Sequence, residues 1–316
     1  MNQMKREPDN VEDGLLRVAA VVLTFRRERL ATQVVKGLIE QEGFAPQQII
    51  VVVNGEGGLD DHELEGAVQM HRLPTNLGPA GGFRAGLEVA AARPEVDWIY
   101  VCEDDVGLFE IPTPRVAELV RGVELEPVAR GIGGVIAYGR RVDPRTGRTV
   151  PFVPDDDEPR FPDVDCAAWG ASLVSAGAVR AGVVPDDDMF FGFEDFDFWF
   201  RMRLAGYGVV LDASTARAVA ERVFHEQREQ QLSGERPVDA EEPWRKYYEA
   251  RNFLILRRRY GRWTWTASHI ALTFRRARLS PTWAHRRAAL RGLWDGLLRR
   301  SGMNPRYLRG AGERAG

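Results

Sequence analysis

Three carboxylates stand side by side at the end of an apolar run. Glu103, Asp104 and Asp105 directly follow residues 98–102, WIYVC. The β-branched and aromatic content predicts a strand buried on both faces, whose carboxyl end would open into the crevice where α/β sheets bind ligands. Neighbouring carboxylates repel one another unless a cation lies among them, and two of them can reach Mg²⁺ or Mn²⁺ together. A solvated acidic turn is the alternative, and the residues alone leave both interpretations open.

A second acidic stretch begins a predicted helix. Glu194 and Asp195 lie in its first turn, and arginines lie near its end, before Gly206. This charge distribution complements the helix dipole, so the carboxylates either only cap the helix or provide a general base beside aromatic walls. His225 follows the apolar run 218–224 and is either structural or a third metal ligand.

A glycine-rich loop, residues 73–86 (LPTNLGPAGGFRAG), opens another predicted helix. Glycines let the backbone approach a ligand closely, and a helix N-terminus offers free N–H groups to an anion. The loop lacks the Lys-Ser/Thr of a P-loop and the spacing of a dinucleotide fingerprint. A phosphate site and a tight loop-to-helix junction are therefore both consistent with it.

Predicted strands and helices alternate along the chain and must position these groups. Buried strands are expected at 18–24, 49–53, 68–71, 97–102, 132–138, 209–211 and 218–224. Helices are expected from about 28 to 39, at 114–124 and, as a short one, at 171–183, and the polar residues up to about 160 are expected to form a surface loop or hairpin over a site. Strand, helix and strand with short connections predict a parallel sheet.

Composition sets the outer limits. With 316 residues, 44% hydrophobic and 28% charged, the chain can form one large α/β domain with an appendage, or two modest domains. Cys102 and Cys166 lie in apolar runs and are typical of buried thiols in a reducing cytoplasm. No signal peptide or 18-residue apolar run is visible, so we expect no spanning helix. The preference for Arg over Lys, with abundant Ala and Gly, is typical of a GC-rich bacterial genome.

The C-terminal region, from about residue 240, is predicted to be helical and basic, with Trp and Leu interleaved with Arg. This pattern is typical of helices that lie on a membrane surface. The alternative is that these helices pack on the rest of the chain or on a second subunit, with a solvated Arg face. No nucleic-acid module accompanies the basic residues, so we expect no nucleic-acid partner.

Taken in order, the stretches VVLTFRR, VVVNG, NLGPAGGFRAGL, a strand ending in EDD, FEDFDFWFR, a histidine and KYYEARN resemble a family 2 glycosyltransferase. The resemblance covers residues 18–252, approximately. Within the family, the sequence is similar in particular to bacterial rhamnosyltransferases and galactofuranosyltransferases of polysaccharide and cell-wall synthesis. It implies an α/β GT-A fold, a Rossmann-like and mostly parallel sheet with helices on both faces, plus a C-terminal helical extension. It also implies a nucleotide-sugar donor (UDP- or dTDP-linked), a divalent metal (Mn²⁺ or Mg²⁺) and inversion at the anomeric carbon. The expected division is a disordered tail (1–16), from its charged residues with Pro and Gly, a GT-A catalytic domain (17–238), from the resemblance, and a basic Trp/Arg-rich helical region (239–316), from its composition.

The resemblance also implies a place for each matching donor-site residue. Thr24, Phe25 and Arg26 would lie near the nucleotide, with Asn54 close to its base. The ribose and diphosphate would be bordered by Asn76, Gly78, Gly81, Gly82 and Arg84. Asp104 and Asp105 match the middle and last positions of the family's DxD-type motif, and His225 matches its metal-binding histidine. Glu103 stands at the first position, where relatives have Asp; it can still bind metal, although its extra methylene moves the carboxylate.

The acceptor side follows in the same way. Trp169 and Gly170 match a segment that borders the acceptor. Asp195 matches the catalytic base, and Glu194 would orient the acceptor.

The expected function is therefore an inverting hexosyltransferase that moves a sugar of the rhamnose or galactofuranose type to a hydroxyl of a glycan, glycolipid or polyprenyl-linked acceptor. One alternative is a sugar nucleotidyltransferase, although residues 24–28 (TFRRE) replace the glycine-rich loop of that class. The other is a non-catalytic sugar-binding protein on the same fold, supported only by Glu103. We expect a cytoplasmic protein, peripheral at the inner face of the plasma membrane, and leave open whether it forms homo-oligomers.

Overall fold

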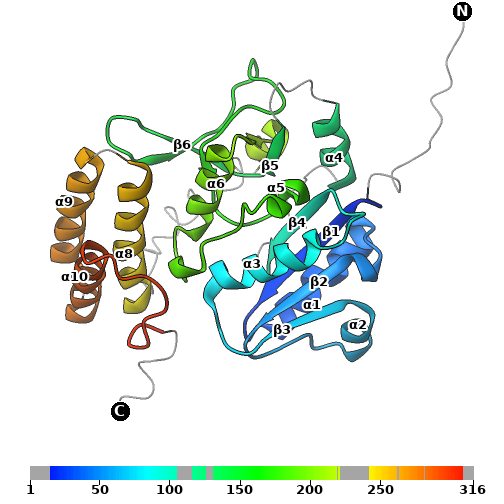
Figure 1. The fold of residues 1–316 in the computed structure, drawn as a ribbon, viewed down its shortest axis with the longest axis horizontal. Helices are drawn as coiled ribbons and strands as arrows, with labels where there is room; N and C mark the ends of the chain where they lie inside the picture. The colour runs from blue at the N-terminus through cyan, green and yellow to red at the C-terminus, as the bar shows by residue number, and fades with distance from the viewer. Residues whose placement is uncertain are drawn as a thin grey trace, which may run out of the picture.

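The computed structural model places a seven-stranded sheet at the centre of the molecule, with helices on both of its faces (Figure 1). It describes residues 15–104, 116–125, 131–218, 220 and 242–308, except 262 and 281. The strand order is β10-β5-β9-β4-β1-β2-β3. The strands are β1 (Val18–Thr24), β2 (Ile49–Asn54), β3 (Gln69–Leu73), β4 (Trp98–Glu103), β5 (Ile132–Ile136), β9 (Ser172–Ser175) and β10 (Gly208–Leu211). All neighbouring pairs are parallel except those that β9 makes with β4 and β5.

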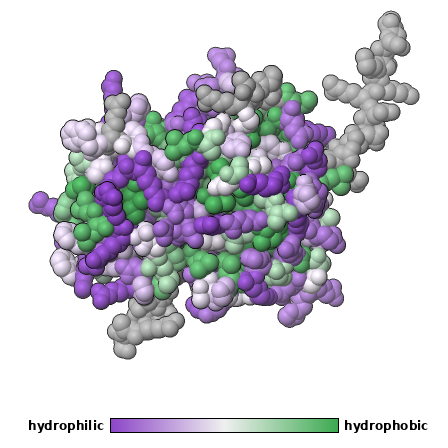
Figure 2. Space-filling model, in the orientation of Figure 1, coloured by the Kyte–Doolittle hydropathy of each residue, from purple (hydrophilic) through white to green (hydrophobic). Residues whose placement is uncertain are grey.

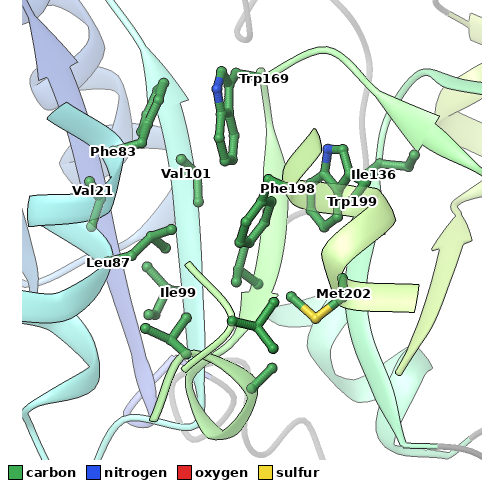
Figure 3. Close-up of a cluster of buried hydrophobic side chains, with 14 of the residues drawn as sticks. Val21, Phe83, Leu87, Ile99, Val101, Ile136, Trp169, Phe198, Trp199 and Met202 are labelled. Carbon is green, nitrogen blue, oxygen red and sulfur yellow. The ribbon is translucent and has the colours of Figure 1, made fainter. Parts of the chain in front are cut away.

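Alternating side chains of each strand serve two cores, because successive residues point to opposite faces of the sheet. Val21 and Leu23 of β1 pack on the face covered by α3 (Gly78–Ala91), α5 (Ala176–Arg180) and α6 (Glu194–Leu204) (Figure 3). Val22 packs on the other face, under α1 (Glu28–Gly37) and α4 (Val116–Glu124). The predicted mostly parallel sheet with helices on both faces is thus confirmed. The central strands β1, β2 and β4 are apolar along nearly their whole length because both of their faces are covered, whereas the edge strand β3 is polar and partly exposed.

Most predicted elements are confirmed within a few residues, and β9 is the exception. Residues 171–183 were predicted as one short helix, but 172–175 form a strand and only Ala176–Arg180 are helical. The segment SLVS has neither the length nor the apolar content of a typical buried strand, and its identity depends on hydrogen bonds to β4 on one side and β5 on the other. The strand predicted at 218–224 is wrong at the two positions that the structure describes, because residues 218 and 220 are helical and continue a helix that begins at residue 213. The other five residues of that prediction lie outside the described ones.

The polar segment after β5 was expected to be a surface loop or a hairpin, and the structure shows a hairpin. Its strands β6 (Gly139–Val142) and β7 (Thr149–Pro151) form a small sheet with β8 (Cys166–Ala167). Its turn lies against the C-terminal helices, where Arg257 donates to the carbonyls of Thr146 and Gly147, each at 3.1 Å. The remaining short elements are α2 (His62–Ala67), a π-helical turn (Leu38–Glu42) and the 3₁₀ turns Pro46–Gln48 and Asp187–Met189.

The predicted C-terminal helices are confirmed as α8 (Pro243–Tyr260), α9 (Trp263–Leu279) and α10 (Trp283–Leu297). In Figure 1, α8 lies between the sheet domain and the other two. The approach of α10 to α8 is close, because a Cβ on Gly292 would lie 2.1 Å from the carbonyl oxygen of Tyr247. None of the described helices is both long enough and apolar enough to cross a bilayer.

Candidate active site

A cleft of about 650 Å³ opens at the carboxyl ends of β1, β2 and β4. Parallel strands end at the same edge of a sheet, so the side chains that follow them converge there. The sequence-predicted residues that line this cleft are Thr24, Phe25, Arg26, Asn54, Asn76, Gly78, Glu103 and Asp104. The structure therefore brings together most of the predicted donor-binding set.

Asp104 is a buried charge with two partners from the β1 end. Asp104 is only 6% exposed, and its carboxylate accepts a hydrogen bond from the Thr24 hydroxyl at 2.8 Å. The Arg27 guanidinium donates to its other oxygen at 3.0 Å. A buried carboxylate is stable only when paired and hydrogen-bonded, so these three side chains form one unit at the base of the cleft.

Two asparagines shape the start of α3 rather than project as free groups. The Asn54 amide donates to the carbonyl of Gly78 at 2.9 Å and accepts from the Leu77 N–H at 2.8 Å. The Asn76 side chain accepts from the Gly78 N–H at 2.8 Å. Gly78 has φ of +72°, and a Cβ there would lie 2.0 Å from the Phe190 carbonyl oxygen, so only glycine fits.

Gly81, Gly82 and Arg84, the other predicted donor-site residues of the glycine-rich loop, do not line the cleft. A Cβ on Gly81 would meet Leu77 at 2.6 Å, and one on Gly82 would meet Leu23 of β1 at 2.4 Å. Arg84 forms ion pairs with Glu88 and Asp187 on the surface. Gly82 allows α3 to pack closely on β1, and Gly81 leaves room for Leu77 at the start of the helix. This is the tight loop-to-helix junction that the sequence left open as the alternative to a phosphate site.

Glu194 and Asp195 begin α6, in surroundings that favour their protonated forms. Glu194 is 4% exposed, and its Oε2 has no hydrogen-bond partner among the described residues. Burial, and then the charges of Asp195 and Glu103, raise the pKa of Glu194 well above its usual range. Burial also raises the pKa of the half-buried Asp195 to about 7, against the opposing effect of the Phe196 N–H, which donates to it at 2.7 Å. Glu194 and Asp195 are not part of the cleft lining, but Glu103, which lines the cleft, is close enough for its charge to act on Glu194.

The predicted acceptor-side residues lie apart from the cleft lining. The Trp169 ring is buried in the core, with its centroid 4.5 Å from that of Phe83 and 5.1 Å from that of Phe198 (Figure 3). Its indole nitrogen has no hydrogen-bond partner in the part of the chain that is described. Its backbone N–H lies close enough to Asp195 to favour the ionised carboxylate. Gly170 follows at a half-buried position with open space beside its Cα.

One wall of the cleft was not foreseen from the sequence. It consists of Phe190, Phe191, Trp244, Arg245, Met303 and Leu308. The Arg245 guanidinium lies 5.2 Å from the Trp244 ring centroid and 5.4 Å from that of Phe191, within cation–π range. The motif KYYEARN lies in α8, but nothing in the sequence places Met303 or Leu308 beside β1.

The loop that carries Phe190 and Phe191 is strained and is held by α8. Phe190 and Phe193 have φ of 58° and 67°, conformations that cost side-chain-bearing residues about 1–3 kcal/mol each. The Asn252 amide nitrogen lies 2.6, 2.7 and 3.0 Å from the carbonyl oxygens of Met189, Phe191 and Gly192. Arg251 donates to the Asn252 side chain at 2.8 Å and to the Met189 carbonyl at 3.2 Å. This fully buried pair therefore fixes the loop that leads directly into Glu194 and Asp195.

The expected metal site can be described only in part. No group of three His, Cys, Asp or Glu side chains that could hold a metal comes together within the described residues. Glu103 and Asp104 both line the cleft, and Asp104 is bound to Thr24 and Arg27. Asp105 and His225, the other predicted ligands, lie outside the described residues.

Comparisons with known proteins give a distant likeness in structure. No protein-family model matches the chain, and no curated protein matches it. The structure of GalNAc-T7 with UDP, GalNAc and Mn²⁺ is similar at 12% identity and a TM-score of 0.44, over 63% of this chain and 42% of that one. S. aureus TarS, residues 1–349, is similar at 12% identity and a TM-score of 0.39, over 90% of this chain and 92% of that one. The first match spans less than half of the GalNAc-T7 chain, and a likeness of this degree assigns no residue role.

Proposed function

We propose that this protein is an inverting, metal-dependent glycosyltransferase of the GT-A type. It would move a sugar of the rhamnose or galactofuranose type from a nucleotide-sugar donor to a hydroxyl of a glycan or lipid-linked acceptor. The observation that carries the proposal is the pairing of a cleft at the carboxyl ends of parallel strands with a carboxylate, Asp195, whose pKa is raised to about 7. The first is the usual ligand site of such sheets, and the second is the pKa that suits a general base at neutral pH.

The donor would occupy the β1 side of the cleft. Asn54 and Asn76 hold the turn at Gly78, so the nucleotide would meet a preformed wall. Arg26 lines the same wall with its guanidinium half-exposed beside Glu56, where it can meet a diphosphate oxygen. The Thr24–Asp104–Arg27 unit keeps the floor of the cleft rigid.

The chain's own residues would carry the transfer as a single displacement. Asp195 would take the proton from the acceptor hydroxyl as that oxygen bonds to the anomeric carbon, while the bond from this carbon to the donor phosphate breaks. Glu194, whose buried position raises its pKa and favours the protonated form, would donate a hydrogen bond that orients the acceptor. The aromatic faces of Phe191 and Trp244 form the wall on which the acceptor's rings would rest.

The metal remains part of the proposal. Glu103, Asp105 and His225 would offer two carboxylates and one imidazole to the metal. Carboxylates suit Mn²⁺ and Mg²⁺, but the imidazole makes the site less selective for these two ions than a site with oxygen ligands alone. When bound, a divalent ion offsets the negative charge that develops on the leaving diphosphate.

The test is a panel of UDP- and dTDP-sugars, incubated with the protein, Mn²⁺ and short glycan acceptors, with release of free nucleotide as the readout. We expect turnover with one donor, and Asp195→Asn should lower kcat by roughly two to four orders of magnitude while nucleotide affinity stays unchanged. Asp188→Asn is the matched control, because Asp188 is an exposed carboxylate six residues before Glu194. Asp195→Asn with normal turnover would place the base elsewhere. Formation of a nucleotide sugar from a sugar phosphate would identify a nucleotidyltransferase, and binding without turnover a sugar-binding protein.

A further inference from the structure

We propose that the outer faces of α9 and α10 form a docking surface for an anionic lipid bilayer. The surface, called the outer helical face below, comprises Trp263, Phe274, Arg275, Arg278, Trp283, Arg287, Arg291, Trp294 and Leu298. It is separate from the cleft, so the inference stands apart from the proposed reaction.

Exposed aromatic side chains are concentrated on these two helices. Trp263 is 80% exposed, Trp283 72%, Phe274 56% and Trp294 55%. Every other Phe, Trp and Tyr among the described residues is buried or half-buried. Trp is the residue that prefers the boundary between water and lipid, because its ring is apolar and its N–H can remain hydrated.

The aromatic residues lie on one stripe of each helix together with arginines. Trp263 and Phe274 are eleven residues apart, as are Trp283 and Trp294, a spacing close to three full turns. Arg278 follows Phe274 by four residues, and Arg287 follows Trp283 by four, so each lies one turn away on the same stripe. Long arginines beside interfacial aromatics are the composition of helices that lie in the plane of a membrane.

The charge of this region is almost entirely positive. Residues 263–300 contain eight arginines and a single acidic residue, Asp295. Asp295 is 2% exposed and is bound to Arg291 at 3.1 Å and Arg300 at 3.0 Å, on the side that faces Tyr247. The outer helical face therefore presents cations with no exposed carboxylate of its own helices among them, which matches an anionic surface.

The opposite faces of both helices are already used inside the chain. Ala288, Gly292 and Leu293 of α10 are buried, with Gly292 against Tyr247 of α8, and His269 and Thr273 of α9 are buried as well. In Figure 2, hydrophobic and hydrophilic residues are interleaved over the end of the molecule that α8, α9 and α10 form in Figure 1. A second copy docked here by a two-fold axis would bring the same positive surface against itself, which like-charge repulsion disfavours.

Vesicle sedimentation tests this without any donor or acceptor. The full-length protein should pellet with phosphatidylcholine vesicles that contain phosphatidylserine, remain in solution with phosphatidylcholine alone, and be partly released by high salt. Arg275→Gln, Arg278→Gln and Arg287→Gln combined should lower the partition coefficient roughly a hundredfold, from about 1 kcal/mol per arginine. Trp263→Ala, Trp283→Ala and Trp294→Ala combined should also release the protein from the vesicles. This release reflects lost apolar contact with the lipid, which salt does not weaken.

Matched controls lie elsewhere on the surface. Leu204→Ala removes a side chain that is 74% exposed at the end of α6, and Arg29→Gln removes an exposed arginine on α1, and both variants should pellet like the unchanged protein. Equal binding to neutral vesicles, or wild-type binding by either triple variant, overturns the proposal. So does a dimer in solution that the three tryptophan substitutions convert to monomer, because the outer helical face would then be a subunit interface. If the protein showed no glycosyl transfer, the vesicle results would still stand, and only the proposed function would be contradicted.

Discussion

Asp195 shows how position rather than residue type sets a side chain's chemistry. Asp197, two residues further on in α6, is fully buried and is bound by Arg201 at 2.6 Å and by Arg259 at 3.0 Å. Asp195 has no ion pair among the described residues, and burial raises its pKa to about 7. Asp197 therefore joins α6 to α8, whereas Asp195 keeps a carboxylate that can exchange a proton near neutral pH.

The raised pKa of Asp195 predicts a pH-dependent effect on stability. Because the folded protein holds this proton more tightly than the unfolded chain, the group stabilises the fold below its unfolded pKa, and that contribution is lost as the pH rises through about 7. Asp195→Asn should thus gain stability relative to the unchanged protein between about pH 5 and pH 8, on the order of 1–3 kcal/mol. Asp195→Asn also removes the repulsion between the charges of Asp195 and Glu194, and this change stabilises the folded protein as well.

The measurement is thermal or urea unfolding of both proteins at the two pH values. Asp188→Asn, a change at an exposed carboxylate, should show no such pH-dependent difference. A constant difference between Asp195→Asn and the parent at all pH values would mean that Asp195 titrates in its ordinary range.

Helix α8 connects parts of the chain that are far apart in sequence. Through Asn252 and Arg251 it holds the loop before α6, and Arg251 also donates to the Gly302 carbonyl at 2.6 Å, just before the cleft residue Met303. Two buried arginines of this helix, Arg251 and Arg257, donate to backbone carbonyls of other segments, which satisfies both the buried guanidinium groups and the carbonyls.

Asn252→Ala should therefore destabilise the fold and slow the reaction. The change leaves the carbonyls of Met189, Phe191 and Gly192 with fewer donors in a buried place, at a cost of about 2–4 kcal/mol. As the loop relaxes, Glu194 and Asp195 shift, so kcat should fall more than nucleotide affinity. Lys246→Ala, which removes a half-exposed ion pair with Glu249 on the same helix, should change stability by less than about 1 kcal/mol. An Asn252→Ala protein with unchanged stability and kcat would contradict this role.

The contact between α8 and α10 can be tested with one methyl group. Gly292→Ala places a Cβ 2.1 Å from the Tyr247 carbonyl oxygen, so the helices must separate, and we expect a loss of about 1–3 kcal/mol. Gly66→Ala is the matched control, because Gly66 lies in α2 with nothing within 4 Å of the added methyl. There the better helix propensity of Ala should stabilise by up to about 1 kcal/mol. Unfolding curves of the two variants should thus shift in opposite directions, and a stabilised Gly292→Ala would contradict the close packing.

The cleft belongs to the whole molecule, because the sheet domain provides one wall and the C-terminal region the other. Trp244 and Arg245 precede the buried part of α8, and Met303 and Leu308 follow α10. The boundary expected near residue 239 therefore does not separate the binding site from an independent appendage. Tyr307 stacks on Tyr247 with centroids 4.1 Å apart, and this contact ties the last described segment to α8.

Nucleotide binding should consequently stabilise the whole chain, and it should need a divalent ion. With Mn²⁺ present, UDP or dTDP at about a hundred times its Kd should add about 2.7 kcal/mol to the free energy of unfolding. Excess chelator, or Glu103→Ala, should remove most of this gain, whereas Glu63→Ala on the exposed α2 should not. Full stabilisation by nucleotide in chelator would contradict the metal assignment.

The sequence by itself determined the elements whose signals are local. Apolar runs predicted β1, β2 and β4, the carboxylates after β4 predicted one side of the cleft, and the acidic first turn predicted the start of α6, because periodicity and helix-end charge depend on neighbouring residues. The tertiary structure alone decided that residues 172–175 form the antiparallel β9, that Asp104 pairs with Thr24 and Arg27, and that Asn252 and Met303 reach the site. These features are contacts between segments tens of residues apart or more, and no local pattern specifies which distant backbone or charge a side chain will meet.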